Sequence, residues 1–309
     1  MPHSSHLPRA TCIVSHFNYG RFVVEACESA LAQVHPFGEI LLVYDGSTDG
    51  STDVVTRHYA SHDLVRLVLK PNGGQLSCFA EGFARSTGDV VFFLDADDVY
   101  EPEYVSQVMA HYASHPECDF VMVAHRKFGT VERLAVDGRG DRDLGYSILA
   151  ALHARRWIGA PTSCLSMRRP VLERIFPLDL EEDWRTRADD CLVFGASVVG
   201  ARKWQLDRPL VRYRIHDANC YQGKNQDAVS DYRRKIAVNR LLQVLSRRIG
   251  YDRRGLAEFA HREFRTIPRP TLRQAGTYAR IGLLSRTLPL RKLGIVTSVL
   301  SHYVRSRVV

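Results

Sequence analysis

The sequence predicts an α/β fold in which a mostly parallel sheet is flanked by helices and followed by a helical C-terminal extension. Three observations lead to this prediction. Strand-like and helix-like segments alternate four times, an acidic cluster directly follows the fourth strand-like segment, and the charge changes sign near residue 230. Alternating segments of this kind form parallel sheets whose ligands bind at the carboxyl ends of the strands. A chain of 309 residues is long enough for one large domain with an appendage.

Apolar runs with strand character alternate with segments whose apolar residues recur at helical spacing. Ser51 or Thr52 is expected to cap the second helix, and Pro102 is expected in the first turn of the fourth. The expected strands cover residues 11–17, 39–45, 65–70 and 89–94, and the expected helices cover residues 19–33, 51–62, 73–86 and 102–115.

Composition places the chain among ordinary globular proteins, with 45% apolar and 25% charged residues. The seven cysteines are odd in number and scattered, and none forms a C-x-x-C pair, which argues against a disulfide framework or a zinc knuckle. We therefore expect reduced, mostly buried thiols in a cytoplasmic protein. The N-terminus lacks the apolar region of a signal peptide, and no apolar run reaches the length of a membrane span.

The net charge of +8 is unevenly distributed. Residues 230–309 contain 18 Lys/Arg and 4 Asp/Glu, whereas the remainder contains 24 basic and 30 acidic residues. We therefore expect a globular domain at residues 1–225 and a basic helical extension at residues 226–309. Helices that mix apolar residues with arginines either pack on the globular domain or bind an anionic membrane surface. Nucleic acid is not an expected partner, because no motif of a known reader fold is present.

The acidic cluster Asp95, Asp97 and Asp98 follows the buried run at residues 90–94. If the extended backbone continues, Asp95 and Asp97 leave the same face of the sheet. Converging carboxylates are costly unless a cation lies between them or one is protonated, and their hard oxygens favour Mg²⁺ or Mn²⁺. The alternative is that Asp98 and its neighbours cap the following helix, although capping needs only one such residue.

These motifs, in this order, resemble the inverting nucleotide-sugar glycosyltransferases of family 2, which have the GT-A fold. The resemblance covers about residues 11–217. It rests on the segments CIVSHFNYGRFVVEACESALAQ, EILLVYDGSTDGSTDVV, NGGQLSCFAEGFARSTGDVVFFLDADDVYEPEYV, ADDCLVFGASVVG and PLVRYRIH.

The resemblance assigns the metal site to the DXD motif, Asp95-Ala96-Asp97. Asp97 corresponds to the ligand of a divalent cation, Mn²⁺ or Mg²⁺, on the diphosphate of a nucleotide-sugar donor, with Asp95 nearer the ribose or bridging through water. The cation neutralises charge on the departing diphosphate. His216 corresponds to a second metal ligand; the alternative is an ordinary core or surface histidine.

The resemblance also implies donor-binding positions. Phe17 corresponds to a residue that stacks on the nucleobase, with a core phenylalanine as the alternative. Asp45 resembles a donor-contacting acid, but the family more often has two adjacent acids, and here Tyr44 occupies the first position. Asn72 and Gly74 belong to a loop that approaches the donor. Ser47 and Asp49 are expected to shape the turn after the second strand.

An acid and an aromatic residue complete the predicted site. Inversion requires a carboxylate that takes the proton from the acceptor hydroxyl. The resemblance assigns this role to Asp190 of the pair Asp189 and Asp190, with capping of the following helix as the alternative. The acids at 181–183 are weaker candidates. Trp157 corresponds to a residue that stacks on an acceptor sugar, or is a core residue.

The predicted function is transfer of a sugar from a nucleotide-diphosphate donor to the hydroxyl of a saccharide or lipid-linked saccharide, in cell-surface polysaccharide or glycolipid synthesis. The predicted location is the cytoplasm or the inner face of the cell membrane. Two alternatives remain. DADDV also fits the nucleophile motif of haloacid-dehalogenase phosphatases, although that motif opens its fold and here three strand-helix units precede it. The other is a nucleotide-sugar-binding module without catalysis.

Overall fold

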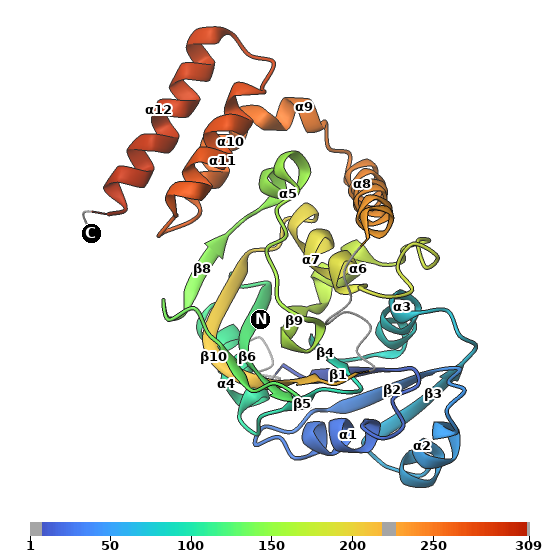
Figure 1. Cartoon of the computed structure of the whole chain (residues 1–309). Helices are drawn as coiled ribbons and strands as arrows, with labels where there is room; N and C mark the ends of the chain where they lie inside the picture. The colour runs from blue at the N-terminus through green and yellow to red at the C-terminus, as the bar shows by residue number, and fades with distance from the viewer. Residues whose placement is uncertain (1–7, 218–226, 308–309) are drawn as a thin grey trace, which may run out of the picture.

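A mixed ten-stranded sheet forms the centre of the computed structural model, which describes residues 8–217 and 227–307 (Figure 1). Eight strands follow the order β3-β2-β1-β4-β9-β6-β10-β5, with β7 paired to β6 and β8 paired to β10. The strands are β1 Ala10–His16, β2 Glu39–Asp45, β3 Val65–Lys70, β4 Val90–Asp95, β5 Val99–Tyr100, β6 Phe120–Gly129, β7 Arg133–Ala135, β8 Arg142–Gly145, β9 Leu165–Arg168 and β10 Lys203–Ile215.

Helices cover both faces of the sheet, because side chains alternate between its faces along each strand. Along β1, Ile13 lies in a core with α3, α5, α6, α7 and α8, whereas Cys12 and Val14 lie in a core with α1, α2 and α4. The helices are α1 Val23–Leu31, α2 Ser51–Tyr59, α3 Gln75–Arg85, α4 Tyr104–Ser114, α5 Ile148–Ala154, α6 Arg169–Ile175, α7 Asp189–Val198, α8 Ala228–Ile249, α9 Arg253–Leu256, α10 Ala260–Arg265, α11 Leu272–Leu283 and α12 Pro289–Arg305.

The predicted fold class is confirmed. Strands β1 to β4 lie within one residue of their expected bounds, and all pairings among them are parallel. The sheet is mixed because β9 pairs antiparallel with both β4 and β6. This arrangement brings the short 3₁₀ helix Thr162–Cys164, which leads into β9, to the carboxyl end of β4.

The predicted helix caps are wrong. The N-cap of α2 is Gly50, and the Asp49 side chain accepts the Ser51 amide at 3.1 Å, so Ser47 and Asp49 shape the turn as expected. The N-cap of α4 is Glu103, and the helix begins two residues after Pro102. Asp98 does not cap α4, because other partners occupy its carboxylate.

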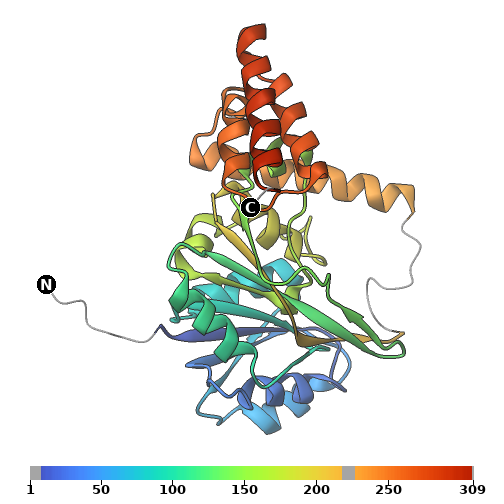
Figure 2. The same ribbon diagram turned by 90° about the vertical axis from the view of Figure 1, so that its left-hand side faces the viewer.

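The C-terminal extension begins with helix α8, which shares a hydrophobic core with the globular domain. Ala237, Leu241 and Leu245 of α8 are buried in the core that contains α3 and α7. Later residues form a third core, from Ala257 to Val299, which packs against α5. Figures 1 and 2 show α10, α11 and α12 standing on the α5 side of the sheet, away from α1 and α2. The predicted boundary at 225/226 lies outside the described residues.

The six described cysteines are buried and free, in agreement with the expectation of reduced thiols, whereas Cys220 lies outside the described residues. Among the described helices, none has the length and apolar character needed to cross a bilayer.

Candidate active site

The three acids after β4 have different environments. The expectation that Asp95 and Asp97 share a face through an extended backbone is wrong, because the chain turns at Asp95 and the Asp98 amide donates to the Asp95 carbonyl at 3.0 Å. Asp97 and Asp98 are only 7% and 1% exposed. The turn therefore buries the side chains of Asp97 and Asp98 almost completely, next to Asp95.

Asp95 is held by hydrogen bonds from β1 and from the first residue of α3. Its Oδ1 accepts the Ser15 hydroxyl at 2.9 Å and the Gln75 side-chain amide at 2.8 Å. Burial, and then the charge of Asp97, raises the pKa of Asp95 to about 6. A carboxylate that is crowded in this way gains from a nearby cation.

Asp97 and His216 lie in contact, although 119 positions separate them in the sequence. The His216 Nε2 lies 3.1 Å from Asp97 Oδ2. Burial raises the pKa of Asp97 to about 6, and burial together with Arg21 and Arg214 lowers the pKa of His216. Neutral imidazole is the form that binds metals. The resemblance assigned both residues to one metal site, and the structure places their side chains in contact.

Asp98 anchors the site. Its carboxylate accepts the Ser163 hydroxyl at 2.6 Å and the Arg214 amide at 2.8 Å. The Arg214 guanidinium in turn donates to the Asp97 carbonyl at 2.7 Å. These bonds join the turn after β4 to the end of β10, directly before His216.

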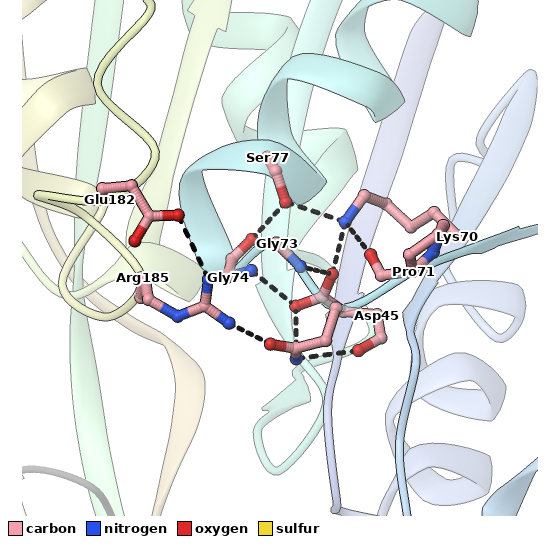
Figure 3. Close-up of polar contacts among 9 residues, drawn as sticks. Asp45, Lys70, Pro71, Gly73, Gly74, Ser77, Glu182 and Arg185 are labelled. Atoms are coloured by element: carbon pink, nitrogen blue, oxygen red, sulfur yellow. Dashed lines mark hydrogen bonds and ion pairs between the residues drawn. The ribbon is translucent and has the colours of Figure 1, made fainter.

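Asp45 holds the loop between β3 and α3 (Figure 3). Its carboxylate accepts the amides of Gly73 and Gly74, each at 2.8 Å, and the Asn72 side chain at 3.0 Å. Lys70 also donates to this carboxylate. Three predicted donor-binding residues, Asp45, Asn72 and Gly74, therefore form one network within the chain.

The backbone conformation of Gly74 and the exposure of Phe17 bear on the roles predicted for them. Gly74 has a φ of +85°, and a Cβ at this position would lie 2.4 Å from the Cα of Arg185, so only glycine fits without strain. Phe17 directly follows β1 and is 43% exposed, which excludes the core alternative and leaves its ring accessible at the carboxyl edge of the sheet.

The adjacent acids at the start of α7 face different surroundings. Asp190 is fully buried, and both its oxygens accept from Arg234 of α8, at 2.7 and 2.8 Å. Asp189 is half-buried, with its carboxyl group withdrawn from water, and this burial, followed by the charges of Asp190 and Asp95, raises its pKa to about 7. The assignment of Asp190 as the base stays a prediction, but the geometry favours Asp189.

Sequence reasoning missed the residue that connects the two ends of the site. The Gln75 side chain donates to Asp95 and accepts the Ala188 amide at 2.9 Å, directly before Asp189. Tyr213 of β10 is half-buried near the same acids: burial, followed by the charges of Asp98, Asp95, Asp97 and Asp189, raises the pKa of its phenol. Only the position of Gln75 at the end of the glycine loop was a sequence signal; nothing in the sequence marked Tyr213 or Arg234.

Trp157 is 37% exposed, so it is not a core residue. It lines a cavity of about 720 Å³ between the segment that carries β8 and the loop before α11. The charged residues of this cavity are Arg139, Asp141, Arg142, Asp143, Arg269 and Arg273.

The residues that could hold a divalent cation are few. Among the described residues, no group of three His, Cys, Asp or Glu side chains has the arrangement of a complete metal site. Asp97 and His216 supply one oxygen and one nitrogen, which fits a cation whose remaining positions are filled by substrate phosphates and water.

Relatives of this chain are glycosyltransferases. An uncharacterised glycosyltransferase of Nostoc sp. is 37% identical over 219 residues, which cover 68% of this chain and 66% of the Nostoc protein. Hyaluronan synthase of Pasteurella multocida is 26% identical over 136 residues, or 44% of this chain and 14% of that enzyme. The chain therefore matches less than two thirds of the length of either relative.

The structural comparison agrees on the fold. The crystal structure of S. aureus TarS 1-349 in complex with UDP-GlcNAc has a TM-score of 0.59 and 16% identity, and the match covers 96% of this chain and 90% of that one. The family model described as glycosyl transferase family 2 matches residues 11–176, more than half of the chain. The chain belongs to glycosyl transferase family 2.

Proposed function

We propose that this chain is an inverting glycosyltransferase that moves a sugar from a nucleoside-diphosphate donor to an acceptor hydroxyl. The supporting observation is that two sets of residues meet at the carboxyl edge of the sheet. One is the contact of Asp97 with His216, and the other is Asp189, whose neighbour Ala188 is hydrogen-bonded to Gln75. S. aureus TarS was crystallised with UDP-GlcNAc, and a donor of that class suits the same fold. The phosphatase alternative is inconsistent with the family membership and with a DXD motif on the fourth strand.

Asp97 and His216 are the residues that would hold Mn²⁺ or Mg²⁺. A bound divalent cation supplies positive charge where the nucleoside diphosphate departs. In this proposal Asp95 contacts the donor ribose or bridges to the site through water, and its hydrogen bonds with Ser15 and Gln75 support the role by fixing its carboxylate. Phe17 offers an exposed ring for stacking on the nucleobase, and Asp45 keeps the glycine loop in shape for the donor.

Asp189 accepts the proton in this proposal. The acceptor oxygen forms a bond to the anomeric carbon while the bond from that carbon to the diphosphate breaks, and the acceptor proton passes to Asp189 Oδ. A pKa of about 7 suits this role, because the carboxylate is available at neutral pH and still basic. Asp190 positions its neighbour through the ion pair with Arg234.

The acceptor is a saccharide or a lipid-linked saccharide, for polysaccharide or glycolipid synthesis. Trp157 supplies an aromatic face for a sugar ring, and the charged residues of its cavity offer hydrogen-bond partners for sugar hydroxyls. We further propose that the basic extension brings the enzyme to the cytoplasmic face of the membrane, where such acceptors are found.

A panel of nucleoside-diphosphate sugars tests this function. The melting temperature of the wild-type protein should rise with one donor class, and rise further with Mn²⁺, because a ligand that binds only the folded state stabilises it. Asp97→Ala should abolish the Mn²⁺-dependent part of the shift. Asp63→Ala, an exposed acid before β3 at the opposite edge of the sheet, is the matched control. If no donor shifts the wild-type protein, the proposal is wrong.

A further inference from the structure

Helix α12 has apolar residues on two opposite faces. Ile295 and Val299 are buried in the core of the extension, with Tyr278 and Ile281 of α11. At about 100° per residue, a second set of apolar residues falls within an arc of roughly 80° on the opposite side of the helix. This second set comprises Leu290, Leu293, Leu300 and Val304, which are 84%, 59%, 47% and 59% exposed.

The turn between α11 and α12 extends this apolar surface. Leu283, Leu284 and Leu288 are 54%, 61% and 77% exposed. Figures 1 and 2 show this turn at the end of the extension that lies farthest from α1 and α2. We call these three leucines, together with the exposed set on α12, the exposed leucine face. Soluble proteins rarely leave so many large apolar side chains together in water.

The charge around the exposed leucine face is predominantly positive. From residue 264 to residue 309 the sequence contains nine Lys/Arg and no Asp or Glu. Arg286 and Arg291 are exposed and Lys292 is half-exposed, all beside the leucines. Arg291 lies 3.3 Å from Glu258, which belongs to the segment before α10. The partner of this face is therefore apolar and anionic at once.

We propose that the exposed leucine face docks on an anionic phospholipid bilayer, with α12 lying along the headgroup boundary and its leucines in the acyl region. This arrangement satisfies both features, since leucine insertion and basic attraction to anionic lipid add to each other. A second copy of the chain would bring like charges together across the contact. This inference rests on the proposed function in one respect: a lipid-linked acceptor gives the enzyme a reason to bind a membrane.

Vesicle sedimentation of the full chain tests the proposal. The wild type should bind phosphatidylcholine vesicles that contain phosphatidylglycerol, and bind pure phosphatidylcholine vesicles at least tenfold more weakly. The double variant Leu293→Ser, Leu300→Ser should bind the anionic vesicles at least tenfold more weakly than the wild type, because two inserted side chains are lost. Arg286→Gln with Lys292→Gln should weaken binding and reduce its dependence on lipid charge.

The matched control is Val34→Ser with Leu64→Ser, which removes two exposed apolar residues that precede β2 and β3. This control should bind vesicles as the wild type does. Unchanged binding of the α12 double variant overturns the proposal, as does a wild-type dimer that the same substitutions dissociate, measured by light scattering. Because binding is measured without any sugar donor, loss of the proposed function would not imitate either result.

Discussion

The carboxyl edge of the sheet and the C-terminal extension use charge in opposite ways. At the sheet edge, Asp95, Asp97 and Asp98 have raised pKa values and fixed hydrogen-bond partners. In the extension, the basic residues after position 264 lie at the surface, beside exposed leucines. Buried charge fixed by the fold serves chemistry on a bound substrate, whereas exposed charge serves attraction to a large surface. The predictions below test this division.

The largest expected effect belongs to Asp97. Asp97→Ala should lower kcat for sugar transfer about 10³-fold, because the proposed cation loses its main ligand and the departing diphosphate keeps its charge. His216→Ala should cost less, since histidine is the second ligand. Steady-state kinetics at saturating Mn²⁺ measure both. If Asp97→Ala retains more than a tenth of the wild-type activity, the acids at the carboxyl edge of the sheet are not the site of catalysis.

Lys203 is a buried lysine of the globular domain, in contrast to the basic residues at the surface of the extension. Its Nζ donates to the carbonyls of Ile158 and Val193 at 2.9 and 2.8 Å, and burial lowers its pKa to about 7. Between pH 7 and pH 10 the unfolded chain therefore binds more protons at this residue, so stability rises with pH. From pH 7 to pH 9 the gain should be about 2 kcal/mol.

Urea unfolding at the two pH values measures this gain. Lys203→Met should remove most of the pH-dependent difference, because methionine has no proton to lose. If the stability of Lys203→Met rises with pH as much as that of the wild type, other titratable groups cause the pH dependence. Lys292→Met, in the half-exposed position on α12, is the control and should keep the wild-type pH dependence.

Arg234 joins α8 to the start of α7. Arg234→Met leaves Asp190 buried without its cation, so the free energy of unfolding should fall by about 2 kcal/mol. Arg234→Lys should recover part of the loss, because lysine keeps the charge but not the two parallel hydrogen bonds. Chemical denaturation measures both variants, and an unchanged midpoint for Arg234→Met would mean that the ion pair does not contribute to stability.

The smallest effect is expected from the exposed leucine face. Leu293→Ser with Leu300→Ser should leave kcat toward a soluble acceptor within about twofold of wild type, because surface substitutions away from the site rarely disturb it. Transfer to an acceptor embedded in anionic vesicles should fall together with vesicle binding. A large loss with the soluble acceptor would show that the two regions are not separate.

The sequence predicted what local patterns determine. The first four strands and the acids after β4 follow from periodicity, whereas the assignment of Asp97 and His216 to one metal site came from the resemblance to the family. The ion pair of Asp190 with Arg234 spans 44 positions and depends on how α8 packs, which no local pattern specifies. The turn at Asp95 and the bridge through Gln75 also depend on tertiary contacts. For the same reason Asp98, for which helix capping was the alternative interpretation, instead binds Ser163 and the end of β10.

The direct test of the central claim compares Asp189→Asn with Asp190→Asn. In the wild type, kcat/KM should fall as pH decreases below about 7, because protonated Asp189 can no longer accept a proton. Asp189→Asn should lose at least 10²-fold and lose this pH dependence, while Asp190→Asn keeps the wild-type pH profile at a reduced rate. A flat profile for Asp190→Asn, together with a wild-type profile for Asp189→Asn, would contradict the account.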